Sequence, residues 1–251
     1  MRLAATAAVI LVAACAAARA DDAADFIAGK TKQCPGCQLN DQRFKGRELP
    51  GADLSGASLR GAVFHRAKLA GAKFGGADLA NANLNKTDLK SAGLAKAELK
   101  NAMFYEADMS LADLSGADLA EAKMGKARMV RAKLDGAAFR ETVLNDSRLD
   151  DVHAVGATFV DSNLNGASLR RGDFTGGAFQ DCGLVGAQFR EAKLAGVKFT
   201  DSDLYDADFS GADLTGADFS GARLTRVNFD GAKLDGVIYK GALMPDGTEH
   251  E

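Results

Sequence analysis

Two cysteines near the N-terminus are the clearest candidates for redox or metal chemistry in this 251-residue chain. Cys34 and Cys37 form a Cys-Pro-Gly-Cys motif, a spacing found in thiol-disulfide oxidoreductases and in zinc sites. No strand-helix-strand pattern surrounds the motif, and no second cysteine pair or histidine partner completes a zinc-binding set. The sequence therefore favours a structural disulfide between Cys34 and Cys37, with thiol-redox activity as an alternative.

Other patterns that carry chemistry are missing from the sequence. The chain has no phosphate-binding loop, no Gly-x-Ser-x-Gly motif and no His-Glu-x-x-His motif, and its three histidines are scattered. A net charge of -3 gives no overall reason to expect nucleic-acid binding. The sequence thus predicts a protein that is not an enzyme, with no catalytic residue, no metal site and no cofactor.

The first 20 residues have the features of an export signal. Met1-Arg2 is followed by an apolar run too short to span a bilayer, and Ala18-Arg19-Ala20 matches a signal-peptidase site. The segment ending at Cys15 also resembles a lipobox, which would make Cys15 a lipidation site. Both routes predict export to the periplasm or beyond, the second with a lipid anchor in the envelope and neither with a membrane span. An oxidising compartment would also favour the Cys34–Cys37 disulfide.

A period of five dominates the remainder of the chain. From Phe44 to Met244, a large apolar residue occupies the centre of 41 consecutive pentads, with Ala154 as the one exception. A small residue lies two positions before each centre, so both side chains can point to one face of a short extended segment. The next two residues, often Ser-Gly or Ala-Gly, would then turn the chain, since glycine accepts a positive φ.

This pattern, as in Ala52-Asp53-Leu54-Ser55-Gly56, resembles the pentapeptide repeat family, whose consensus is A-(D/N)-L-x-x. The resemblance implies an all-β fold, a right-handed quadrilateral β-helix with four pentads per coil and about ten coils. It also implies that the centres and small residues stack inward. We expect a signal peptide at 1–20, an N-terminal cap at 21–43, the β-helix at 44–244 and an acidic tail at 245–251.

The aromatic residues agree with a coil of twenty residues. Six of them are spaced by twenty and are predicted to stack as a core ladder on one side of the coil: Phe139, Phe159, Phe179, Phe199, Phe219 and Tyr239. We expect Ala154 to leave a local cavity or a bulge, because alanine is about three carbons smaller than leucine. Cys182 occupies a small inward position, where a buried cysteine behaves as a small apolar residue.

The C-terminal coil is the candidate site for self-association. Ile238 and Leu243 occupy positions that are normally polar and outward, beside Phe229 and Tyr239. An open end of a β-helix also leaves backbone groups unpaired. These observations predict a homodimer through the C-terminal coils, unless the tail folds back over the end.

Three functions remain open at the level of sequence. The first is an exported, non-enzymatic structural or protein-interaction solenoid whose protein partner is unknown. The second, implied by the family resemblance, is a DNA-mimicking topoisomerase inhibitor. That role needs a continuous acidic surface, which lysines and arginines interrupt here, and a cytoplasmic location. The third is a thiol-redox protein that acts through Cys34 and Cys37.

Overall fold

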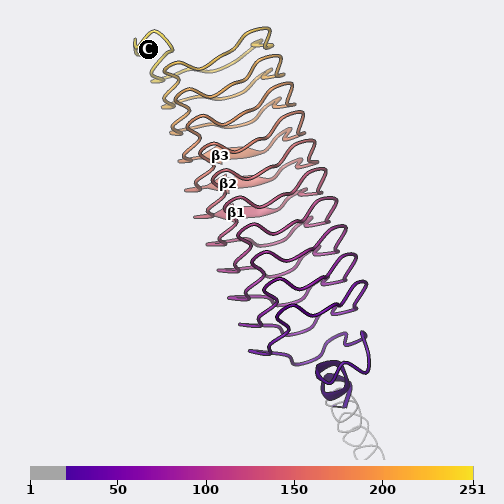
Figure 1. The fold of residues 1–251 in the computed structure, drawn as a ribbon. Coiled ribbons are helices and arrows are strands. Elements are labelled where there is room, and N and C mark those ends of the chain that lie inside the picture. Colours follow the sequence, from indigo (N-terminus) through magenta and orange to yellow (C-terminus); the bar gives the residue numbers. More distant parts are fainter. Residues whose placement is uncertain (1–20, 251) are drawn as a thin grey trace, which may run out of the picture.

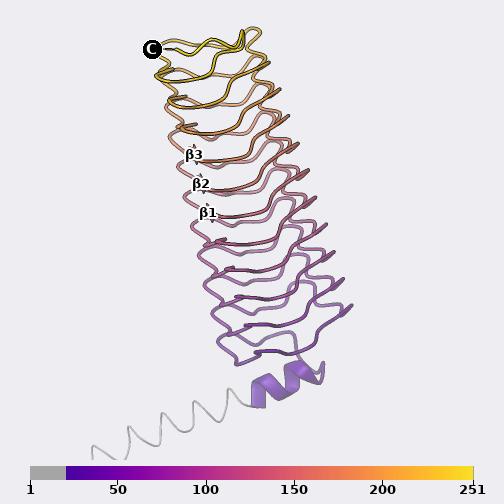
Figure 2. The same ribbon diagram turned by 90° about the vertical axis from the view of Figure 1, so that its left-hand side faces the viewer.

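The chain folds into a right-handed quadrilateral β-helix, which Figures 1 and 2 show from the side as a stack of coils. The computed structural model describes residues 21–250. The predicted signal peptide and Cys15 therefore lie outside the described residues. Parallel bridges join each residue before a pentad centre to the residue twenty positions later, from Gln33↔Asp53 to Arg223↔Leu243. Each coil thus contains four pentads, as predicted, and coils about 4.8 Å apart make a rod about 50 Å long.

Each pentad forms one side of the coil and one corner. Leu54 N–H donates to Lys73 O of the next coil at 2.8 Å, while Asp53 N–H donates to Lys32 O of the previous coil at 2.9 Å. At the corner, Ala57 N–H donates to Leu54 O at 3.1 Å, and Gly56 has a φ of 62°. The second corner residue has a positive φ in every pentad from Gly36 to Gly241.

The aspartate or asparagine before the centre stabilises the corner. Asp53 Oδ1 accepts a hydrogen bond from Ser55 N–H at 3.1 Å, and Asp213 Oδ1 accepts from both the N–H and the hydroxyl of Thr215. The backbone N–H after the centre has no backbone partner in these corners, so the side chain satisfies it. This geometry explains the (D/N) of the repeat, which sequence reasoning treated only as an outward polar residue.

The core is a stack of pentad centres. In the predicted ladder, the rings of Phe139 and Phe159 lie 4.4 Å apart and nearly parallel, and the stacking continues to Phe219 and Tyr239 at 5.9 Å. Rings of a second ladder, such as Phe189 and Phe209, meet the first edge to face at 5.5–5.6 Å. Buried alanines fill the space between the centres, which explains how a chain with only 7% aromatics keeps a continuous core.

The β-helix begins two pentads earlier than predicted. The boundary at residue 44 is wrong, because Cys34 and Leu39 are fully buried at centre positions, and Gln33 and Gln38 already bridge to the next coil. A cysteine in place of leucine hides the first pentad in the sequence. Residues 21–27 form a short helix that lies against this first coil (Figure 2).

That helix is fixed to the coil by aromatic and cationic contacts. Phe26 is fully buried, and its ring meets the Phe44 ring edge to face at 5.4 Å. Arg47 donates hydrogen bonds to Phe26 O and Ile27 O at 3.2 and 3.1 Å, and its guanidinium lies over both rings. Arg47 thus supplies a donor to Ile27 O, which accepts no backbone N–H within residues 21–250, and a second donor to Phe26 O, which also accepts from Gly29 N–H at 3.0 Å.

The expected bulge at Ala154 does not form. His153 bridges to Asp173, and Ala154 N–H donates to Asp173 O at 2.7 Å, as in regular pentads. Val152 replaces the usual alanine beside Ala154, and the Phe174 ring of the next coil reaches over Gly172, where a Cβ would lie only 2.5 Å from the ring. Larger neighbours therefore compensate for the smaller centre.

Three strands mark corners that open: β1 (Ala138–Arg140), β2 (Thr158–Val160) and β3 (Ala178–Gln180), which form a parallel sheet in the order β1-β2-β3. After β1, the Ser162 hydroxyl of the next coil inserts into the corner. It accepts from Thr142 N–H at 3.0 Å and donates to Phe139 O at 3.2 Å. Ser202 does the same for Cys182 N–H and Phe179 O after β3.

The residues that insert into these three corners are Ser162, Cys182 and Ser202, all buried. Thr142 heads the same column, but the Leu119 corner that it contacts stays closed by Ala122 N–H to Leu119 O at 3.1 Å. Cys182 Sγ contacts Phe159 O at 3.5 Å after β2. Burial raises the pKa of the Cys182 thiol to about 12, so the thiol stays neutral. A column of polar residues at small inward positions therefore converts three tight corners into extended strands.

Candidate functional site

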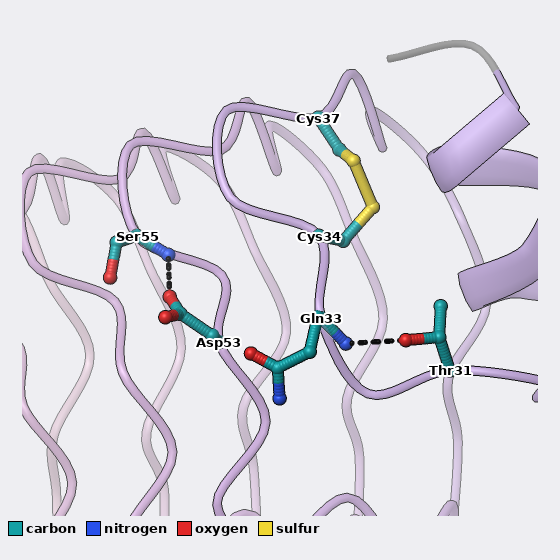
Figure 3. The surroundings of a disulfide bond; sticks show 6 residues. All are labelled: Thr31, Gln33, Cys34, Cys37, Asp53 and Ser55. Carbon is teal, nitrogen blue, oxygen red and sulfur yellow. Dashed lines mark hydrogen bonds between the residues drawn. A yellow bond between two sulfur atoms is a disulfide. The ribbon is translucent and has the colours of Figure 1, made fainter. Parts of the chain in front are cut away.

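The Cys-Pro-Gly-Cys motif forms the first corner of the β-helix. Cys34 and Cys37 are joined by a disulfide with a Cα–Cα distance of 5.4 Å, beside Gln33 and the Asp53–Ser55 turn (Figure 3). Both cysteines are fully buried, and Gly36 has a φ of 68°. A redox-active disulfide must be reached by an attacking thiolate. The buried position therefore suits a structural link better than a redox centre.

The outer faces carry ion pairs between neighbouring coils. On one face, Lys193 Nζ lies 3.2 Å from Asp173, and Lys233 Nζ lies 3.1 Å from Asp213. The hydrogen bonds from Thr215 and Lys233 lower the pKa of Asp213 to about 2. Such exposed pairs contribute little to stability, so this face is mainly a solvated surface.

One corner carries a continuous acidic column that sequence reasoning missed. It consists of Glu121, Glu141, Asp161, Asp181 and Asp201, all with positive φ, on successive coils. Among them, Glu121 pairs with Lys100 at 3.1 Å. Reading every twentieth residue at the corner positions would have found this column. Four steps of about 4.8 Å make it about 19 Å long, a small part of the rod surface.

One coil carries an uninterrupted run of cations. Its members are Lys123, Lys126, Arg128, Arg131 and Lys133, which point outward on three successive sides and their corners. Within residues 21–250, none of these five side chains forms an ion pair, whereas most cations elsewhere on the rod do. Lys126 Nζ lies over the Tyr105 ring at 5.9 Å, and Arg128 Nε donates to Ser110 Oγ at 3.2 Å. This coil therefore carries five cations without a direct ion pair in the described part of the chain, although carboxylates of neighbouring coils attract Lys126, Arg131 and Lys133.

The C-terminal coil exposes the apolar residues that the sequence singled out. Ile238 is 50% exposed and Leu243 is 37% exposed, while Phe229 and Tyr239 are half-buried. The tail folds back along one side of this coil, where Leu243 pairs antiparallel with Glu249 and Tyr239 contacts the His250 ring. On the other three sides, the N–H groups of the centre residues have no backbone partner among residues 21–250.

Within residues 21–250, no cluster of three or more histidines, cysteines or acidic residues has the arrangement of a metal site. In the same part of the chain, no helix is long and apolar enough to cross a membrane.

The five-residue corners and twenty-residue bridges are the structural signature of one family. The sequence profile of "Pentapeptide repeats" matches the chain in eight copies, which fall within residues 37–76, 72–110, 112–151, 139–176, 182–221 and 202–238. The chain belongs to the pentapeptide repeat family. No curated protein sequence matches the chain at a significant level.

Several solved structures of pentapeptide repeat proteins are similar to this one. HetL, involved in heterocyst differentiation regulation in the cyanobacterium Nostoc sp. strain PCC 7120, is 28% identical, with a TM-score of 0.57; the match covers 90% of this chain and 96% of HetL. A thylakoid-lumen protein of Arabidopsis thaliana is 29% identical over 48% of this chain and 74% of its own, with a TM-score of 0.30. The plasmid-mediated fluoroquinolone resistance protein QnrB1 is 17% identical over 80% of this chain and 92% of its own, with a TM-score of 0.32.

Proposed function

We propose that this pentapeptide repeat protein is an exported, non-enzymatic scaffold that presents its rigid outer columns to a protein partner. The proposal rests on the contrast between the core and the outer surface. The core is buried, whereas the surface carries an acidic corner column, a cationic coil and exposed apolar side chains at the C-terminal coil. Every pentad centre from Cys34 to Leu224 is buried and used for packing, so the residues available for binding along this part of the rod are the outward ones. Solenoids commonly use such extended surfaces to bind other proteins.

Export is supported by the buried disulfide as well as by the N-terminal sequence. Disulfides persist in oxidising compartments and are rare in the cytosol, and Cys34–Cys37 fixes the first coil beneath the N-terminal helix. A reporter enzyme that is active only after export, fused after Ala20, should be active in a bacterial host. Replacing Ala18 and Ala20 by bulky residues should block processing, whereas Cys15→Ser should not. Lipid on the mature protein that disappears in Cys15→Ser would assign the lipobox route instead.

Self-association through the C-terminal coil is the second element of the proposal. The three uncovered sides of this coil combine unpaired N–H groups with the exposed side chains of Ile238 and Leu243. A two-fold dimer would bury both. Light scattering should give a dimer for the mature protein and a monomer for Ile238→Lys with Leu243→Lys. A monomeric parent, or a dimer that persists in the double variant, would exclude this interface.

The two alternatives receive less support. A thiol-redox role requires accessible sulfur atoms, and both Cys34 and Cys37 are fully buried. A DNA-mimicking role requires a long acidic surface, and the acidic column spans only five coils at one corner. A thiol-reductase assay and a topoisomerase inhibition assay would test them, and strong activity in either would replace the scaffold proposal.

A further inference from the structure

One leucine occupies a position where neither its backbone nor its side chain is favoured. Within residues 21–250, twenty-two residues other than glycine have a positive φ, and Leu111, at 63°, is the only apolar residue among them. Side chains are disfavoured in this left-handed region, where glycine, asparagine and aspartate are the usual choices. Leu111 is also 59% exposed, more than any other large apolar residue in the described part of the chain. Packing within the rod therefore does not explain this leucine.

The surroundings of Leu111 form a small apolar hollow with a charged rim. A cavity of about 310 Å³ is lined by Ser110, Leu111, Arg128, Val130, Arg131 and Asp151. Leu111 N–H donates to Val130 O at 3.0 Å, so the two apolar side chains belong to adjacent coils at the same corner. The hollow lies on the coil with the uninterrupted run of cations, and it therefore combines exposed apolar surface with positive charge.

The positive charge at this rim exceeds the negative charge that the protein places there. Arg131 forms no ion pair within residues 21–250, and Arg128 uses only its Nε, which donates to the neutral Ser110 hydroxyl. The one carboxylate in the lining, Asp151, accepts two hydrogen bonds from Arg171 at 2.7 and 3.0 Å, and these bonds and the attraction by Arg171 and Arg131 lower the pKa of its carboxyl. One carboxylate thus faces three arginines. Guanidinium groups bind carboxylates in bidentate geometry, so Arg128 and Arg131, which form no ion pair within the described residues, favour an anionic occupant.

We propose that this hollow binds an acidic segment of a protein partner, which places a large apolar side chain against Leu111 and Val130 and carboxylates against Arg128 and Arg131. The hollow, at about 310 Å³, has room for a large apolar side chain and part of its flanking segment, and the excess of arginines sets the sign of the flanking charges. The proposal rests on the scaffold function and names the chemistry of its partner. The positive φ and the exposed side chain of Leu111 are unfavourable in the free protein. Burial of the Leu111 side chain by the bound partner would offset this cost.

A peptide selection tests this directly. The mature protein, immobilised, is used to select from a random dodecapeptide display library, with parallel selection on the Leu111→Asn variant. Enriched peptides should combine Asp or Glu with a large apolar residue, and their affinity should fall at least tenfold for Leu111→Asn and for Arg128→Gln with Arg131→Gln. Affinity should also fall with added salt, because the rim interaction is ionic.

Two controls separate binding from folding. Leu111→Asn and Leu111→Gly should keep or raise the melting temperature, because both residues accept a positive φ better than leucine. Arg66→Gln is the matched charge control, since Arg66 is also an exposed corner residue with a φ of 58° and no ion pair; its affinity should equal that of the parent. Enriched peptides that are neutral or basic, or no enrichment relative to Leu111→Asn, would overturn the proposal. Peptides that bind but ignore Leu111→Asn would exclude this hollow and leave the scaffold function standing.

Discussion

The buried hydroxyl column makes a sharp prediction about two serines in equivalent positions. Ser162 and Ser147 both occupy the small inward position, and both are 1% exposed. The Ser162 hydroxyl bridges Thr142 N–H and Phe139 O. Ser147 Oγ, by contrast, has no hydrogen-bond partner among residues 21–250. The corner at Ser147 is closed in the regular way, because Ser147 N–H donates to Leu144 O at 3.1 Å. The same substitution, serine to alanine, should therefore have opposite effects at the two sites.

The magnitudes follow from the contacts. Ser162→Ala removes two hydrogen bonds, each worth about 1 kcal/mol net, so we expect a loss of about 2 kcal/mol. Ser147→Ala removes a buried hydroxyl without a partner, so we expect a change between about 0 and 1 kcal/mol in the stabilising direction. At about 2–4 °C per kcal/mol for a chain of this size, Ser162→Ala should melt about 4–8 °C lower than the parent.

Two measurements check this prediction. Circular dichroism gives the melting temperatures, and amide hydrogen exchange by NMR reports on the Thr142 N–H itself. In Ser162→Ala this amide should exchange faster, because its acceptor has been removed. Equal melting temperatures for the two variants, or a Thr142 amide that stays protected in Ser162→Ala, would refute the assignment of the bridging role to the Ser162 hydroxyl.

Three further predictions concern the core, the buried thiol and the cap. Phe199→Ala should cost about 3–5 kcal/mol in urea unfolding, whereas the neighbouring outward change Lys198→Ala should cost less than about 0.5. Burial raises the pKa of the Cys182 thiol from 9.0 to about 12, so the thiol is neutral in both the folded and the unfolded chain below pH 9. Between pH 9 and 12 only the unfolded chain loses this proton, so the free energy of unfolding should fall as the pH rises. Cys182→Ser should abolish this part of the pH dependence of the melting temperature. Arg47→Ala removes the hydrogen bonds to Phe26 O and Ile27 O, so limited proteolysis at residues 21–32 should become faster while the coils stay resistant.

Much of the fold could be predicted because one period governs both sequence and structure. The pentad centres identified the buried residues, and the twenty-residue spacing of the aromatics identified the ladder that contains Phe159 and Phe199. The start of the β-helix was missed because Cys34 replaces the leucine by which a pentad is recognised. The bulge at Ala154 was wrongly expected because compensation came from Phe174, a residue of the next coil.

The functional features were harder to predict, since they depend on relations between coils. The opened corners at β1–β3 require a hydroxyl or thiol from a residue twenty positions later, and a single pentad does not show this. The acidic column and the exposed Leu111 become visible only when the corner residues are aligned separately from the centres. The pentad pattern predicts which residues are buried. The alignment of successive coils is needed to predict which outward residues lie next to one another on the surface.

The bridging of each residue to one exactly twenty positions away also determines how this protein can change in length. Inserting or deleting one pentad outside residues 139–202 would keep the repeated corner geometry, yet it would rotate all later pentads by a quarter turn around the rod. Within 139–202 the same change would separate the Ser162 and Ser202 hydroxyls from the corners that they bridge. The acidic corner and the cationic coil would then change their relative orientation without any point substitution. Only changes of twenty residues would preserve the faces, so length variation in units of five offers a route to new surfaces at little cost in stability.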